Sequence, residues 1–190
     1  MEELLINLGS IYPLSQGATE YLSIHLKTKH LNKKDLLLKI GHVSENIYFI
    51  HKGLLRCFYL LDDKEVSSWF MKEGDVMISV ESFFKQTISY ESIQAIEEAM
   101  VYYISYSELQ YVYKNFIEFN IIGRVLTERY YTLSEQRLHS IRLQKARDRY
   151  LFLIKEHPEL ILRVPSKFLA SYLGVTEVTL SNIKGELQIS

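Results

Sequence analysis

The chain has 190 residues, of which 47% are hydrophobic and 24% are charged, and its formal net charge is −1. This apolar content excludes a disordered chain, and a single cysteine, Cys57, excludes an internal disulfide framework. The sequence does not start like a signal peptide and has no apolar run of about 18 residues, so we expect a cytoplasmic protein without membrane contact.

The charge is unevenly distributed along the chain. Residues 141–190 carry eight Lys or Arg against five Asp or Glu, whereas residues 1–140 carry 14 against 18. The C-terminal quarter is therefore basic and the remainder slightly acidic. This distribution favours a DNA-binding unit attached to a sensor unit.

The first predicted elements are helical, over residues 1–30, where apolar residues recur at mixed helical spacing. From Leu36 to Tyr106 the pattern changes to short apolar or alternating runs, separated by turn signals such as Gly41 and Gly53. Regular spacing of such runs predicts an antiparallel β-barrel or β-roll. We therefore expect an α+β fold in which residues 1–115 form a β-roll sensor domain.

A helix capped by Ser107 is predicted next, followed by a long amphipathic helix over residues 116–139. Its apolar stripe recurs at steps of three and four residues and consists of Phe119, Ile122, Leu126, Tyr130 and Leu133. A helix of this length cannot bury all of itself on a small roll. We therefore expect residues 116–140 to be a dimerisation helix with this stripe at the seam, and packing on its own roll is the alternative.

The segment 141–190 is predicted to be a helix-turn-helix domain. A helix from Gln144 to Lys155 ends before Pro158, and residues 160–164 lead to a second helix that opens at Pro165 and Ser166. Gly174 ends that helix, and Thr176 caps another, with Val175 and Leu180 spaced as a hydrophobic staple.

This helix–glycine–helix plan is that of the DNA-reading motif, whose second helix enters the major groove. Its outward residues are polar or small and suit hydrogen bonds with bases and phosphates. The candidate DNA-binding residues are Thr176, Glu177, Val178, Thr179, Ser181, Asn182, Lys184 and Lys167. An ordinary helical hairpin with a solvated face is the alternative.

The whole chain resembles the Crp/Fnr regulators, through Gly41, the run IYFIHKG ending at Gly53, Gly74-Asp75, and RVPSKFLASYLGVTEVTLSNIK near the C-terminus. The resemblance implies a cyclic-nucleotide-binding-like roll, a dimerisation helix and a helix-turn-helix. It also marks two departures, because the family usually has an acidic residue where Val178 stands and an arginine where Asn182 stands. The β wing that often follows the second helix is not expected here.

Aromatic side chains in the predicted roll can either line an effector pocket or fill the core. In the resemblance, the stretch from Gly74 to Glu81 matches the ribose-binding turn without its second glycine, and Ser89, Tyr90 and Glu91 fall on the triplet that holds the cyclic phosphate. Because serine replaces the arginine, we expect no response to cyclic AMP. The candidate effector residues are Trp69, Phe70, Ile78, Glu81, Phe83, Ser89, Tyr90 and Glu91.

No nucleophile–base motif, phosphate-cradling glycine loop or paired metal-ligand spacing is visible, so we expect no catalytic residues, metal or cofactor. The prediction is a non-enzymatic transcription regulator that acts as a homodimer on double-stranded DNA, with an unidentified small-molecule effector and RNA polymerase as further partners. One alternative is a β-roll module for ligands or proteins that does not bind DNA, and a cupin-like enzyme is a more distant one.

Overall fold

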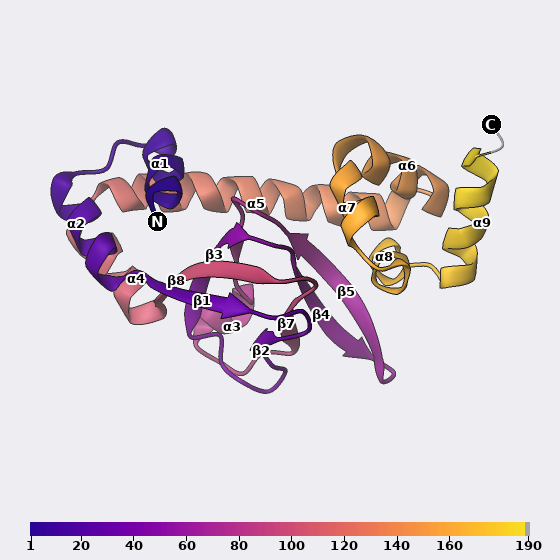
Figure 1. Cartoon of the computed structure of the whole chain (residues 1–190), viewed down its shortest axis with the longest axis horizontal. Coiled ribbons are helices and arrows are strands. Elements are labelled where there is room, and N and C mark those ends of the chain that lie inside the picture. The colour runs from indigo at the N-terminus through magenta and orange to yellow at the C-terminus, as the bar shows by residue number, and fades with distance from the viewer. Residues whose placement is uncertain (189–190) are drawn as a thin grey trace.

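The computed structural model describes residues 1–188 and shows a β-roll beneath one long helix, with four short helices at one end (Figure 1). The helices are α1 (Glu2–Ile11), α2 (Gln16–His25), α3 (Val80–Lys85), α4 (Tyr106–Asn115), α5 (Glu118–Leu143), α6 (Ala146–Glu156), α7 (Pro158–Arg163), α8 (Ser166–Leu173) and α9 (Glu177–Gln188). The strands are β1 (Lys27–Leu31), β2 (Leu36–Leu38), β3 (Asn46–Lys52), β4 (Leu55–Leu61), β5 (Lys64–Met71), β6 (Val76–Met77), β7 (Glu91–Ala95) and β8 (Ala99–Ser105).

The roll consists of two four-stranded antiparallel sheets, ordered β1-β8-β3-β6 and β2-β7-β4-β5. Alternate residues of facing strands point inward, and Ile50, Leu55, Ile93 and Val101 are completely buried between the sheets. Apolar runs flanked by turn residues therefore form the strands that the sequence predicts. The α+β fold with an antiparallel roll and a long helix is confirmed.

The prediction of helix throughout residues 1–30 is wrong in its last part. Pro13 separates α1 from α2, and Ser15 caps α2 by accepting a hydrogen bond from the backbone N–H of Ala18. Strand β1 then takes the place of a continued helix and pairs with β8. Four of its five residues are exposed at the edge of the sheet, so it lacks the alternating apolar pattern that identifies a strand.

The cap of α4 lies two residues before the predicted one. The hydroxyl of Ser105, not of Ser107, accepts from the backbone N–H of Glu108, and the Glu108 carboxylate accepts from the backbone N–H of Ser105. The spacing of these two residues is that of a capping box, which satisfies two N–H groups where one hydroxyl cap satisfies one. This reciprocal pair fixes the start of α4 against β8.

The apolar stripe of α5 faces the protomer's own roll and N-terminal helices. Phe119 and Ile122 are 5% and 1% exposed, and the hydroxyl of Tyr130 accepts a hydrogen bond of 2.8 Å from the backbone N–H of Val76. The structure therefore corrects the expectation that this stripe as a whole faces a partner, because Phe119, Ile122 and Tyr130 are engaged within the chain. Leu126 is only partly buried.

The C-terminal helices differ from the prediction in one element. Pro158 ends the preceding helix as expected, but it also occupies the first turn of α7, where a missing N–H has no cost. Residues 160–164, left unassigned in the sequence, therefore belong mainly to this extra helix. Among residues 1–188, no helix has both the length and the apolar character needed to cross a membrane.

Candidate DNA-binding surface and sensor site

The turn between α8 and α9 is built as the sequence predicts. Gly174 adopts the left-handed conformation, with φ of 66°, and ends α8. The hydroxyl of Thr176 accepts from the backbone N–H of Thr179 at 3.1 Å, which caps α9. Val175 packs against the buried cluster that contains Leu180, as a hydrophobic staple requires. These local interactions fix the angle between the two helices.

The two sides of α9 differ in character. Leu180 and Ile183 point into the core, with exposed fractions of 1% and 7%. The opposite side carries Val178, Ser181, Asn182 and Gly185, because helical periodicity places these four residues on one face. The structure brings these residues together with the exposed Thr176, Glu177 and Thr179 along one surface of α9. This side of α9 is therefore exposed along the length of the helix that carries these residues.

The polar groups on this surface divide into bonded and available ones. The hydroxyls of Thr176 and Thr179 are 2.9 Å apart and bond with each other, so they serve the cap. The side chains of Ser181 and Asn182 form no hydrogen bond within the described part of the chain. Lys184 lies on the flank, 3.4 Å from the hydroxyl of Ser166 at the start of α8. Lys167 is exposed in the first turn of α8.

Helix α8 packs directly on strand β5 of the roll. The hydroxyl of Ser171 accepts from the backbone N–H of Ser67 at 3.2 Å, and the ring of Tyr172 lies 5.1 Å from that of Phe70. The residues of this shared core are buried and come from both parts of the chain: Leu54, Phe70, Ile96, Tyr150, Leu153, Leu160, Val164, Leu169, Ala170, Leu173, Leu180 and Ile183. The C-terminal helices and the roll are therefore joined by one continuous apolar core.

Arg56 strengthens the same junction from the roll side. It is 1% exposed, and its guanidinium lies between the rings of Phe58 in β4 and Phe168 in α8, 4.1 Å and 3.5 Å from their centres. Its N–H groups donate to the side chains of Glu65 and Gln94. Burial lowers the pKa of Arg56 despite the ion pair with Glu65. A charge buried in this way requires the partners that the junction supplies.

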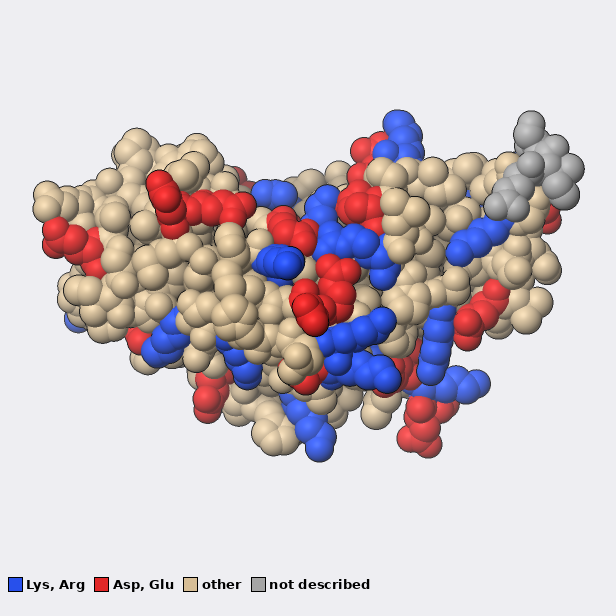
Figure 2. All heavy atoms as spheres, in the orientation of Figure 1, with Lys and Arg blue, Asp and Glu red and all other residues tan. Residues whose placement is uncertain are grey.

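Ion pairs surround the apolar junction. Arg163 in α7 forms a bidentate pair with Glu73 at 2.8 Å and 2.9 Å and also binds Glu97, while Lys72 pairs with Glu159. Figure 2 shows basic and acidic side chains interleaved across the middle of this face, between the roll and the C-terminal helices. These pairs hold α7 to the turns that follow β5 and β7.

The pair between Arg163 and Glu73 predicts an acid-sensitive junction. Burial alone would raise the pKa of Glu73, but hydrogen bonds from Arg163 and from backbone N–H groups lower it to about 2, from an ordinary value of 4.5. A carboxyl group with a lowered pKa stabilises the fold above its unfolded-state pKa and loses this contribution as the pH falls toward its folded-state value. The contribution should therefore disappear between pH 4.5 and about 2.

The measurement is urea denaturation of the wild-type chain and of Glu73→Gln over this pH range. The variant should be less stable than the wild type at neutral pH, and the difference in unfolding free energy should shrink steadily as the pH falls to about 2. A difference that stays constant throughout that range would contradict the assignment.

Two arginines that the sequence analysis did not single out position the helix-turn-helix. Arg149 in α6 donates to the carbonyl oxygen of Leu173 at 2.7 Å and to that of Gln144 at 2.6 Å, so it satisfies the C-terminal ends of α8 and α5. Arg137 in α5 donates to the carbonyl oxygen of Tyr172, and its guanidinium lies 3.6 Å from the centre of the Tyr172 ring. The sequence shows these two residues only as basic residues within predicted helices, and it does not indicate their partners.

The structure places the candidate effector residues in several different environments. Phe70 faces α8, Phe83 is completely buried beside Ile104 and Leu109, and Trp69 packs against the core between the sheets. Tyr90 is 60% exposed. Glu81 pairs with Lys85 on the surface, and Ile78 is partly buried beside Phe83. These aromatic residues mainly fill the structure, which was the alternative interpretation.

Ser89 and Glu91 form a buried polar pair inside the roll. The hydroxyl of Ser89 lies 2.9 Å from that of Ser79, donates to the carbonyl oxygen of Glu91 at 2.8 Å, and accepts from its N–H. The two residues are 3% and 9% exposed. This hydroxyl is already saturated by neighbouring groups.

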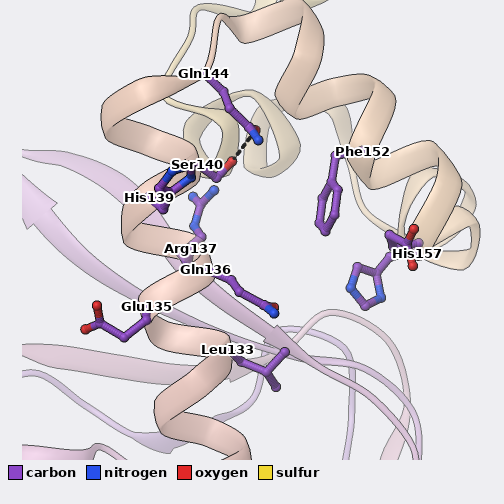
Figure 3. A pocket seen from close by; sticks show the side chains of 10 residues that line it. Leu133, Glu135, Gln136, Arg137, His139, Ser140, Gln144, Phe152 and His157 are labelled. Carbon is purple, nitrogen blue, oxygen red and sulfur yellow. Dashed lines mark hydrogen bonds between the residues drawn. The ribbon is translucent and has the colours of Figure 1, made fainter.

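Among the hollows of the described chain, two lie elsewhere. One is an open groove of about 670 Å³ between the C-terminal half of α5 and α6 (Figure 3), where Leu133 and Gln136 lie opposite Phe152 and His157. The other is an apolar cavity of about 90 Å³ where α1, α2, α4 and α5 cover the sheet that contains β3 and β8. Neither is lined by any of the candidate effector residues.

The sequence of the roll matches a known protein family. The match is to the cyclic nucleotide-binding domain and covers residues 28–116. In this chain the domain spans β1 to β8 and α4, and α5 to α9 follow it. A search of curated protein sequences gives no match.

Solved structures extend the likeness to nearly the whole chain. FixK2 from Bradyrhizobium japonicum is 19% identical with a TM-score of 0.75, covering 86% of this chain and 85% of FixK2. The c-di-GMP responsive global regulator CLP from Xanthomonas campestris is 17% identical with a TM-score of 0.69, covering 92% of each chain. A regulator assigned to the Crp/Fnr family from Eubacterium rectale is 16% identical with a TM-score of 0.72, covering 95% of this chain and 88% of its own.

The fold of this protein is therefore that of the Crp/Fnr regulators, and the resemblance seen in the sequence is confirmed. CLP and the Eubacterium rectale protein are both described as regulators.

Proposed function

We propose that this protein is a transcription regulator that binds double-stranded DNA through α9. The observation that carries the proposal is the exposed face of α9, opposite Leu180 and Ile183, in a helix-turn-helix whose glycine turn and threonine cap are both formed. Helices presented in this way enter the major groove with their N-terminal residues at the base edges. Lys167 and Lys184 flank the face and suit phosphate contacts.

The active form in this proposal is a two-fold dimer joined along α5, so that two copies of α9 reach half-sites about one DNA turn apart. Since Phe119 and Ile122 are buried within the protomer, the partner would contact the rest of the helix surface. Tyr131 and Leu138 are exposed there, by 66% and 41%, and Leu126 and Leu133 remain partly accessible. Once bound to DNA, the dimer would recruit or block RNA polymerase.

DNA binding should be strongly salt-dependent. Fluorescence anisotropy with a pool of random-sequence 30-bp duplexes, titrated between about 50 and 200 mM salt, should show affinity falling as a power of the salt concentration. Lys184→Ala and Lys167→Ala should each lower the slope by about one, whereas the matched variant Lys29→Ala, on the exposed strand β1, should leave it unchanged. Two chains should be present per duplex.

Absence of binding at the lowest salt would overturn the proposal and favour a roll that binds ligands or proteins without DNA. A complex with one chain per duplex would overturn the dimer alone.

The proposed regulator does not take cyclic AMP as its effector. The serine that stands where the family has a phosphate-binding arginine, Ser89, is 3% exposed and already bonded, and the neighbouring Glu91 would oppose a phosphate. Isothermal titration with cyclic AMP and cyclic GMP should therefore give no binding heat. A dissociation constant on the order of 1 μM for either nucleotide would contradict this expectation.

A further inference from the structure

The outward face of α9 lacks the group that most often reads guanine. Residues 164–190 contain no arginine, and arginine is the commonest side chain in specific guanine contacts. Lysine can make the same contact, but Lys184 lies on the flank of α9, with its ammonium group 3.4 Å from Ser166 of α8. The centre of the face is therefore left with a valine, a serine, an asparagine and a glycine.

Val178 and Asn182 match the groups that an A·T base pair presents in the major groove. Val178 is 71% exposed and is the apolar side chain at the centre of an otherwise polar or small face, so its methyl groups are available to a thymine methyl. Asn182 has no hydrogen bond within the described chain, and its amide can pair with N6 and N7 of adenine. The two residues are four apart, so they lie side by side one turn along the helix.

Gly185 continues this face, and no packing among residues 1–188 requires a glycine there. A Cβ atom at Gly185 would meet no atom of the described residues within 4 Å, and the backbone conformation of Gly185 is not one that requires glycine. Glycine inside a helix weakens the helix relative to alanine. A glycine that the fold does not need, on the surface directed at DNA, permits the DNA to approach the helix backbone closely.

Building on the proposed function, we propose that α9 reads an A·T-containing half-site. Val178 packs on a thymine methyl, Asn182 pairs with an adenine edge, and Gly185 allows the helix to lie deep in the groove. Recognition of the half-site therefore requires a thymine methyl group and an adenine ring nitrogen. An arginine at position 182, as the resembled family has, would instead require a guanine.

The first experiment removes these groups from the DNA one at a time. A binding site is selected from a random-core duplex library with the full-length protein, and each thymine is then replaced by deoxyuridine and each adenine by 7-deazadeoxyadenosine. Loss of one thymine methyl should weaken binding about fourfold, from the value of one buried methyl group. Loss of N7 at one adenine should weaken it roughly 5- to 100-fold.

Two protein variants then assign each effect on the DNA to one side chain. The deoxyuridine effect should vanish in Val178→Ala and persist in Asn182→Ala, and the 7-deaza effect should show the reverse pattern. If duplexes are selected but neither replacement weakens binding, or the selected half-site is guanine-based, the inference is overturned and the proposed function stands. If no duplex is selected, the proposed function fails and the inference fails with it.

The second experiment separates helix stability from DNA contact at Gly185. Gly185→Ala should raise the melting temperature by about 2–4 °C because alanine favours helix. It should nevertheless weaken DNA binding by roughly fivefold or more, because the added methyl group meets the DNA. The matched variant is Gly9→Ala in α1, where a Cβ also has nothing within 4 Å. It should stabilise the protein without changing affinity. Unchanged or stronger binding by Gly185→Ala would overturn the role of the glycine.

Discussion

Replacing Phe70 by alanine should separate the unfolding of the C-terminal helices from that of the roll. The side chain is 8% exposed and fills the shared core between β5 and α8, with its ring 5.1 Å from that of Tyr172. Removing a buried phenylalanine side chain costs about 3–5 kcal/mol, a large part of the stability of a typical domain. The cavity would open between β5 and α8. The lost free energy should therefore mainly weaken the packing of helices α6–α9 on the roll.

Differential scanning calorimetry is the measurement. The wild-type chain should unfold in one transition, since one core spans both parts, whereas Phe70→Ala should show an earlier transition for α6–α9 and a later one for the roll. Phe83→Ala is the control, because Phe83 is completely buried but lies beside Tyr106 and Phe84, within the roll. It should lose similar stability and keep a single transition. A single, unshifted transition in Phe70→Ala would show that the shared core does not couple the two parts.

Replacing Gly53 by alanine should be the most damaging glycine substitution in the roll. Gly53 connects β3 to β4 with φ of 98°, and a Cβ atom there would lie 2.6 Å from the carbonyl oxygen of Glu98 and 2.7 Å from Cα of Ala99. These neighbours are backbone atoms, which cannot move aside as a flexible side chain can. Backbone strain and overpacking together predict a loss of about 3 kcal/mol or more.

Gly41→Ala isolates the steric part of this effect. Gly41 also has a positive φ, of 86°, but a Cβ atom there would meet nothing within 4 Å. This variant should lose only about 1–2 kcal/mol, the cost of the left-handed conformation. Urea denaturation of both variants measures the difference, and equal losses would refute the steric argument. Since the N–H of Gly53 also donates to Glu73 at 2.8 Å, Gly53→Ala should further disturb the ion pair with Arg163.

The features that could be predicted from the sequence are those that depend on neighbouring residues. The turn at Gly174, the cap at Thr176 and the inward Leu180 are set by spacings of a few residues, and all three were predicted. The family resemblance similarly rests on short motifs. By contrast, the contacts of Arg149 with Leu173 and of Arg163 with Glu73 join residues 24 and 90 positions apart, and no local pattern indicates such partners.

The side of the sheet on which Trp69 and Phe70 lie could not be predicted from the sequence for a related reason. The pairing of β4 with β5 shifts register between Cys57 and Phe58, so Trp69 lies opposite Cys57 and Phe70 opposite Arg56. Trp69 packs against the core between the sheets, whereas Phe70 and Arg56 face α8. A sequence of aromatic residues does not reveal on which side of a strand each one lies when a bulge changes the alternation.

The shared core also limits how this architecture can be recombined. Leu54, Phe70 and Ile96 on the roll are covered by side chains of α6–α9, and the buried guanidinium of Arg56 is stacked on Phe168 of α8. A hybrid protein that joins this roll to the C-terminal helices of a protein with the same fold would leave an apolar patch and a buried arginine without their partners. Such chimaeras will fold only when the donor helices bring a matching surface for β5, so the two halves have to be exchanged together with their interface.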